Sequence, residues 1–188
     1  MAQVTTTQNG YDTVSQSGSG EVWSSISNLP YPTEGQATCA VPAGNQSNTL
    51  HFGVPQEAAD IPTGATFDSM TFYYTRKQTG DFWASEATWV GKTSYSSSFV
   101  WQSSSGGVPD DTWESKAPGG DASYWRISGL SSTAIIDGLK NGLLTIDVYV
   151  SAGAPPLDDL TAYIKSVTVE ITYTTVEGKR GAIIATIV

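Results

Sequence analysis

Apolar and polar residues alternate most regularly between residues 160 and 174. Side chains of a strand point in turn to its two faces, so this pattern predicts a strand with one buried and one solvated face. The residues predicted to face the core are Tyr163, Val167, Val169, Ile171 and Tyr173. Lys165 falls on the same side, near the start of the strand, where its stem can cover the core while the ammonium group reaches water.

Similar alternation, interrupted by turn residues, predicts seven further strands. These are residues 36–41, 48–54, 66–76, 83–92, 95–102, 123–127 and 143–150. In the strand at 66–76, Phe67 and Tyr73 lie opposite the core side and need a partner or partial cover. The predicted core consists of Met70, Phe72, Tyr74, Leu144, Ile146, Val148, Val167, Val169 and Ile171.

One helix is predicted at residues 132–141, after a serine cap and before the stop signal Asn141-Gly142. Residues 103–121 contain many glycines, prolines and serines and are predicted to form a long loop. Together these elements predict an all-β fold: an antiparallel, jelly-roll-like β-sandwich with one short helix and extended terminal arms. The expected organisation is an N-terminal arm at 1–22, a sandwich domain at 23–176 and a C-terminal arm at 177–188.

The composition narrows the possible partners. The net charge of -9 and the small share of lysine and arginine argue against direct nucleic-acid binding. The polar first residues do not resemble a secretory signal, and no apolar run of membrane-spanning length occurs, so no membrane contact is expected. These features predict a soluble protein made in the cytoplasm.

Candidate chemistry is sparse. A Ser-His-Asp arrangement requires a histidine, and the sole one, His51, sits in an alternating segment, which favours a structural role. Cys39, the single cysteine, is expected in the core. The pairs Asp110-Asp111 and Asp158-Asp159 are either calcium ligands or solvated turn residues, the latter favoured because neither has EF-hand spacing. We therefore expect no enzyme activity, no metal and no cofactor.

Five of the six tryptophans lie between residues 83 and 125. Such rings either form a platform for sugars or fill a core or subunit interface, and the second alternative is favoured. Trp113, within the predicted loop, is a candidate anchor for a partner pocket.

The C-terminal segment is apolar on both faces, and its candidate interface residues are Ile183, Ile184, Ile187 and Val188. An exposed segment of this kind would invite strand pairing, so it must be covered. It either adds a strand to an adjacent subunit, which the glycines around Lys179-Arg180 favour, or pairs with its own sheet.

The order of these elements resembles the β-sandwich domains of structural proteins in tailed bacteriophages. The resemblance covers residues 23–174 and is carried by Trp23 and residues 34–38, 50–52, 61–67, 124–126, 144–148 and 162–173 together with the short helix. Members usually carry Asp where Lys165 stands, and residues 177–188 have no counterpart.

The resemblance implies a non-enzymatic component of a phage virion, as a capsid-decoration, minor capsid or tail-associated protein assembled in the host cytoplasm. Its expected partners are identical subunits and major capsid or tail proteins, joined by subunit packing and exchange of terminal arms. A carbohydrate-binding host-adsorption module, with a host glycan as ligand, is the alternative.

Overall fold

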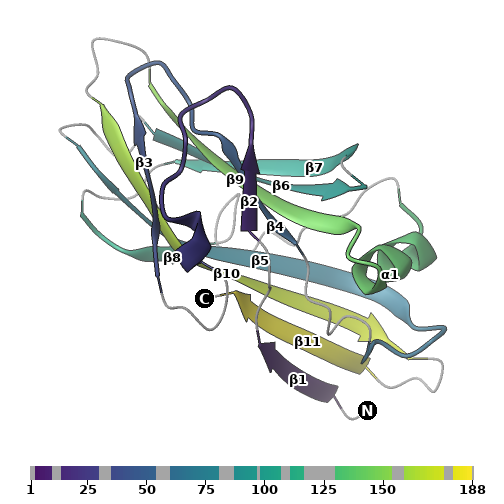
Figure 1. The fold of residues 1–188 in the computed structure, drawn as a ribbon. Helices are drawn as coiled ribbons and strands as arrows, with labels where there is room; N and C mark the ends of the chain where they lie inside the picture. The colour runs from purple at the N-terminus through teal and green to yellow at the C-terminus, as the bar shows by residue number, and fades with distance from the viewer. Residues whose placement is uncertain are drawn as a thin grey trace.

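The strands of the computed structural model form two sheets that pack face to face (Figure 1). The structure describes residues 3–9, 14–29, 35–53, 60–80, 87–96, 98–106, 111–116, 130–153, 159–175 and 180–187. The predicted strand at 123–127 lies outside these residues. For residues 69–74, 98–106, 166–170 and 180–187, among others, the backbone alone is described.

Sheet A has the strand order β1-β11-β10-β5-β8, with β3 also paired to β10. Its strands are β1 (Gln3–Asn9), β3 (Ala37–Val41), β5 (Thr66–Thr79), β8 (Glu114–Lys116), β10 (Leu160–Thr174) and β11 (Arg180–Ile187). Sheet B has the order β2-β4-β9-β6-β7. Its strands are β2 (Val14–Ser17), β4 (Thr49–Gly53), β6 (Ala87–Tyr95), β7 (Ser98–Gly106) and β9 (Leu144–Ala152).

Successive strands mostly alternate between the two sheets, as in a jelly roll: β3 is in sheet A, β4 in B, β5 in A and β6 in B. The pairs within the described strands are antiparallel except for β1 with β11, which run parallel. The predicted all-β sandwich is confirmed. The region predicted as a loop at 103–121 instead contains the end of β7 and the short strand β8.

Helix α1 (Ser132–Lys140) lies at one end of the sandwich, beside β5 and the start of β9 (Figure 1). The Ser131 side chain accepts a hydrogen bond from the Ala134 amide, which caps the helix as predicted. Gly142, at φ 63°, ends it in the left-handed region that glycine tolerates best. Ile135, Ile136 and Leu139 are buried against the core, so the helix closes this end of the sandwich.

A β-bulge reverses the alternation in β10 and corrects one prediction. The register with β5 shifts between Ile164 and Ser166, so Lys165 is the extra residue. Ala162 and Ile164 are therefore the buried residues before the bulge, and Ile171 and Tyr173 after it. Tyr163, which was predicted to face the core, faces outwards with Lys165.

A second register shift, between Thr172 and Tyr173, explains on which face of the sheet Phe67 lies. It changes the parity of β5, and Phe67 packs against the core instead of lying on the opposite face. Four of the predicted core residues, Leu144, Ile146, Val148 and Ile171, are fully buried, as expected. The side chains of Met70, Phe72, Tyr74, Val167 and Val169 lie outside the described part.

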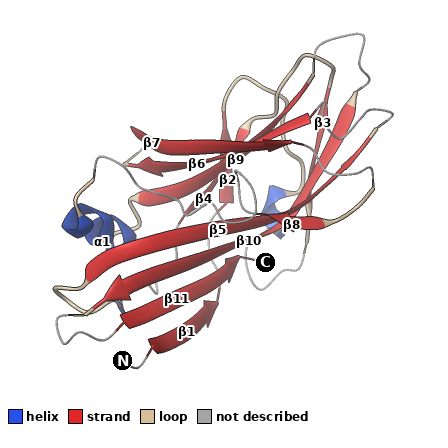
Figure 2. Cartoon of the chain, turned by 180° about the vertical axis from the view of Figure 1, so that it is seen from behind, coloured by secondary structure: helices blue, strands red, loops and turns tan. Residues whose placement is uncertain are grey.

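Both segments that were expected as arms contain strands of the chain's own sheets. Strand β11 pairs with β10 of the same chain, and β1 pairs in parallel with β11 at the edge of sheet A (Figures 1 and 2). The closer partner is favoured because strands joined by a short connection usually become neighbours. In β1, Val4 and three consecutive threonines from Thr5 suit a pleated strand despite the polar composition. In this structure the segment thus pairs with its own sheet, the second of the two alternatives, and exchange with an adjacent subunit stays a prediction.

Replacing Ile146 with alanine tests the register of the core. Ile146 is fully buried in β9, so Ile146→Ala should lower the free energy of unfolding by about 2–5 kcal/mol through lost burial and a residual cavity. Thr145→Ala, one residue away on the outer face, is the control and should cost much less. Urea unfolding followed by fluorescence measures both, and equal effects would place β9 one residue out of register.

Candidate functional site

A hydrogen-bonded chain of four side chains crosses the outer face of sheet B. His51 Nδ1 lies 2.7 Å from Asp147 Oδ1, and Ser17 Oγ lies 2.6 Å from His51 Nε2. On the far side, the Ser94 hydroxyl donates to Asp147 Oδ2 at 2.6 Å. The four residues come from β2, β4, β9 and β6, so this chain joins four adjacent strands of one sheet.

The pairing of the strands explains why these residues meet. In β4 and β9 the buried residues Leu50, Phe52, Ile146 and Val148 face the core, so His51 and Asp147 face outwards. The two are direct partners across the β4–β9 pair. Ser15 is the direct β2 partner of His51, and Ser17 is its diagonal neighbour on the same face.

The hydrogen bonds of His51 indicate the tautomer of its neutral imidazole. The Asp147 side chain is 2% exposed and the His51 side chain 28%, whereas Ser17 is exposed. A carboxylate can only accept, so His51 Nδ1 carries the proton that is donated to Asp147. In the neutral ring Nε2 is then an acceptor, and the Ser17 hydroxyl donates to it. Carboxylate, imidazole and hydroxyl thus stand in the order used for nucleophilic catalysis.

The sequence alone predicts no Ser-His-Asp arrangement, whereas the structure brings these three side chains together. Ser17 lay in a segment predicted as an arm, and Asp147 and His51 are 96 residues apart. The outward parity of His51 and Asp147 was the only available signal. It could not show that β4 and β9 are neighbours in this register, which depends on the whole fold. Whether the chain is an enzyme stays a matter of prediction.

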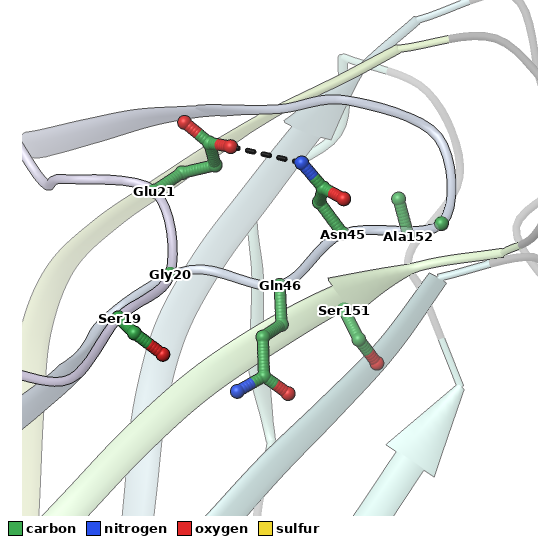
Figure 3. Close-up of a pocket in the computed structure, with 8 residues that line it drawn as sticks. Ser19, Gly20, Glu21, Asn45, Gln46, Ser151 and Ala152 are labelled. Atoms are coloured by element: carbon green, nitrogen blue, oxygen red, sulfur yellow. Dashed lines mark hydrogen bonds between the residues drawn. The ribbon is translucent and has the colours of Figure 1, made fainter.

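A polar pocket of about 360 Å³ lies where the segment after β2, the β3–β4 loop and the end of β9 meet (Figure 3). Its lining is Ser19, Gly20, Glu21, Gly44, Asn45, Gln46, Ser151 and Ala152. The Asn45 side-chain amide donates to the Glu21 carboxylate at 3.0 Å. Most of these side chains carry hydrogen-bonding groups, and none is aromatic, so the pocket suits a polar ligand.

Backbone hydrogen bonds hold the pocket walls in place. The amide of Glu21 donates to Gln46 O at 2.8 Å, and that of Ala152 donates to Asn45 O at 3.0 Å. Beneath them, the buried Ser47 hydroxyl accepts from the Val150 amide at 3.1 Å. Gly20 passes so close to Gln46 O that a Cβ there would lie 2.4 Å from it. The three segments are therefore fixed before any ligand arrives.

Trp113, the predicted interface anchor, packs on the outer face of sheet A. Lys165 Nζ lies 4.4 Å and Lys77 Nζ 5.5 Å from its ring centroid, and Lys77 Nζ also lies 4.7 Å from that of Tyr163. Lys77 makes an ion pair with Asp111 at 2.7 Å. These contacts hold the segment before β8 on the sheet, so Trp113 is engaged within its own chain.

The other predicted interface residues lie in or next to β11. Ile183, Ile184 and Ile187 are paired with β10, as partners of Ile171, Glu170 and Val167, but their side chains are not described. Val188 lies outside the described residues. Contact of these residues, or of Trp113, with another subunit stays a prediction.

The described residues include no group of three or more His, Cys, Asp or Glu side chains placed to bind a metal ion, and no helix among them is long and apolar enough to cross a membrane. Of the paired aspartates, Asp111 binds Lys77, and Asp159 accepts from the Ala43 amide at 3.2 Å. Asp110 and Asp158 lie outside the described part.

The tryptophans divide between core and surface. Trp23 and Trp89 are buried, at 2% and 0% exposure, with ring centroids 6.4 Å apart. Trp113 is half-buried, as described above. Trp83 and Trp125 lie outside the described residues, and the side chain of Trp101 is not described. The described rings therefore form no continuous platform.

No protein-family model and no curated protein matches the sequence. Among solved structures, the chain is similar to a mutant of Xylanase10C from Cellvibrio japonicus in complex with xylopentaose, with 18% identity and a TM-score of 0.40. The aligned region covers 88% of this chain and 29% of the xylanase chain, so this chain spans less than a third of that protein. A xylan-binding module, CBM15, has 20% identity and a TM-score of 0.37 over 84% of this chain and 95% of the module. At these scores the likeness adds no argument about function.

Cys39 in β3, whose Sγ lies 3.5 Å from the backbone oxygen of the pocket residue Glu21, gives a test of this region. Burial disfavours the thiolate and, with a smaller contribution from the Glu21 charge, raises the pKa of the thiol to about 12. At pH 8 the Cys39 thiol of the native protein should therefore react with a thiol reagent far more slowly than that of the protein unfolded in urea. In urea, one thiol per chain should react at once. A native thiol that reacts as fast as a free cysteine would show that β3 and the pocket wall open readily.

Proposed function

We propose that this protein is a carbohydrate-binding β-sandwich whose sugar site is the pocket at Glu21, Asn45, Gln46 and Ser151. The observation that carries the proposal is the lining itself. It combines a carboxylate, two carboxamides and two hydroxyl groups in a pocket of about 360 Å³. Sugar hydroxyls both donate and accept hydrogen bonds, and this set of groups offers both functions.

The side chains remain available for such a ligand. The exposed Asn45 gives an amide hydrogen to Glu21, which leaves its carbonyl oxygen as an acceptor directed by that contact. Gln46 is exposed and contributes both a donor and an acceptor. Since backbone hydrogen bonds already order the walls, little conformational entropy is lost on binding.

Charge selects the class of sugar. Among the described residues, the pocket lining contains Glu21 and no lysine or arginine, and the whole chain has a net charge of -9. An anionic glycan would meet repulsion with no compensating cation in the lining. The pocket therefore favours neutral sugars.

Truncating Gln46 tests the sugar site. Gln46→Ala should weaken binding of a neutral oligosaccharide by about 3- to 10-fold, the loss expected for one or two hydrogen bonds. Gln36→Ala removes an exposed carboxamide outside the pocket and is the matched control. A glycan array finds the ligand, and calorimetry measures both variants. If no neutral glycan binds, or if Gln46→Ala binds as wild type, the proposal is wrong.

A second candidate is a structural component of a tailed-phage virion, as a capsid-decoration, minor capsid or tail-associated subunit. The sequence resemblance suggests it, and the edge strand β1 supports it. Within the described residues β1 is paired only with β11, so its other edge is free to accept a strand from another copy or from a capsid or tail protein. Assembly would then use this edge instead of arm exchange.

Proline substitutions in β1 test this edge. In a parallel pair, neighbouring residues direct their amides to opposite edges, so one of Thr5 and Thr6 faces β11 and the other the open side. We expect the two variants Thr5→Pro and Thr6→Pro to differ. The proline that removes an amide facing β11 should lower the melting temperature. The proline on the open side should leave the melting temperature unchanged but abolish self-association in analytical ultracentrifugation. A wild-type protein that stays monomeric at high concentration, or two variants that both still associate, would contradict the assembly role.

A further inference from the structure

We propose that Ser17 is a nucleophile, activated by His51 and oriented through Asp147, that cleaves acyl esters carried on sugar hydroxyls. The nucleophile stands on the geometry of sheet B alone. The sugar portion of the substrate rests on the proposed function of the pocket.

Each group occupies the position that its role requires. The hydroxyl of exposed Ser17 lies 2.6 Å from His51 Nε2, within reach for proton transfer to that nitrogen. Asp147 holds His51 Nδ1 at 2.7 Å, fixes the tautomer and stabilises the imidazolium that forms. The Ser94 hydroxyl binds the other carboxylate oxygen at 2.6 Å, so the plane of the carboxylate is also fixed. Ser17 and His51 are the catalytic residues; Asp147 and Ser94 are positioning residues.

The need of the buried Asp147 carboxylate for hydrogen bonds does not explain the position of Ser17. His51 and Ser94 together give Asp147 one hydrogen bond on each oxygen. Ser17 is exposed and does not contact Asp147, so water could serve its hydroxyl equally well. The contact of Ser17 with His51 Nε2 completes the hydroxyl–imidazole–carboxylate sequence of a catalytic triad, but it adds no hydrogen bond to the buried Asp147.

Donors for a developing oxyanion follow Ser17 directly. In the described part of the chain, the amides of Gly18 and Ser19 donate to no other residue, and both residues are exposed. Gly18 has φ 130°, a conformation that lets the backbone leave β2 beside the nucleophile. The amide after a nucleophilic serine is a common oxyanion donor. Gly18 and Ser19 are thus the groups assigned to this role.

The reaction balances without a further reagent. Ser17 Oγ attacks the acyl carbon, its proton passes to His51 Nε2, and the negative charge falls on the carbonyl oxygen. The ester C–O bond then breaks, the sugar hydroxyl takes the proton from His51, and the acyl group stays on Ser17. Water attacks this acyl-enzyme with His51 as base, which releases a carboxylic acid and restores Ser17.

The pocket lies close enough to hold the sugar. Ser19, two residues after Ser17, is part of its lining. Ser151, also in the lining, and Asp147 have the same outward parity in β9 and are four residues apart, about 13 Å at roughly 3.3 Å per residue. A short oligosaccharide in the pocket can therefore present an acylated hydroxyl to Ser17.

Covalent labelling of the full chain tests the nucleophile directly. A fluorophosphonate probe should form one adduct, located at Ser17 by peptide mass spectrometry. Ser17→Ala should abolish it, whereas Ser15→Ala, which removes the neighbouring serine on the same face, should not. Both positions are exposed, so neither variant is expected to unfold the protein.

Hydrolysis of p-nitrophenyl acetate gives the second readout. His51→Gln should lower kcat/KM by at least about 100-fold. Asp147→Asn should lower kcat with little change in KM, as expected for a residue that acts through His51. An unlabelled wild-type protein, an adduct that survives Ser17→Ala, or hydrolysis unaffected by Ser17→Ala would overturn the nucleophile.

Glycan binding by the wild-type protein separates this inference from the proposed function. A Ser17 adduct in a protein that binds no neutral glycan supports the nucleophile and contradicts the sugar substrate. Glycan binding without an adduct retains the proposed function and overturns the nucleophile.

Discussion

The contact of Trp89 with β5 holds the two sheets in one relative position, and the rest of the structure depends on it. Trp89 projects from β6 into the core, where its Nε1 donates to Gln78 Oε1 at 3.1 Å. The Arg76 guanidinium lies 5.4 Å from its ring centroid. Arg76 and Gln78 are themselves buried. Polar groups so far from water need defined partners, so the sheets cannot slide without breaking these contacts.

The contact between Trp89 and β5 also helps to position the candidate site. Trp23 packs against Trp89, and its indole donates to Asn48 O at 2.9 Å. The Trp23 backbone is also bound at both its amide and its carbonyl by the Gln16 side chain, at 2.9 Å each. Gln16 precedes Ser17, and Asn48 precedes β4. The core contact therefore extends through one tryptophan to the strand that carries Ser17 and to the segment that forms the pocket wall.

The parts of the fold that could be predicted are those fixed by local pattern. The alternation in β9 and the cap and stop of α1 are properties of a few adjacent residues, and they were predicted correctly. The bulge at Lys165 could not be predicted, since it is defined by the register of β10 against β5. For the same reason, the face of the sheet on which Tyr163 lies could not be predicted. The cluster of lysines and aromatic rings around Trp113 depends on that face and was therefore also missed.

The candidate site was missed for the same reason. Parity shows that His51 and Asp147 face outwards, as do many residues of an exposed sheet face. Only the pairing of four strands places His51 beside Asp147, and puts Ser17 and Ser94 on the neighbouring strands within hydrogen-bonding reach of them. The composition of the pocket was equally hidden, because its lining comes from three segments that meet through backbone hydrogen bonds.

The parallel pairing of β1 with β11 also concerns synthesis of the protein on the ribosome. Residue 3 pairs with residue 180, so the first described strand has no partner until nearly all of the described chain has been made. At typical elongation rates of about 5–20 residues per second, this delay is on the order of ten seconds or more. The threonine-rich, largely polar sequence of β1 suits this wait, since a strand with few apolar side chains offers little for other nascent chains to bind. The hydrophobic β11, in contrast, emerges when β10 is already available to cover it.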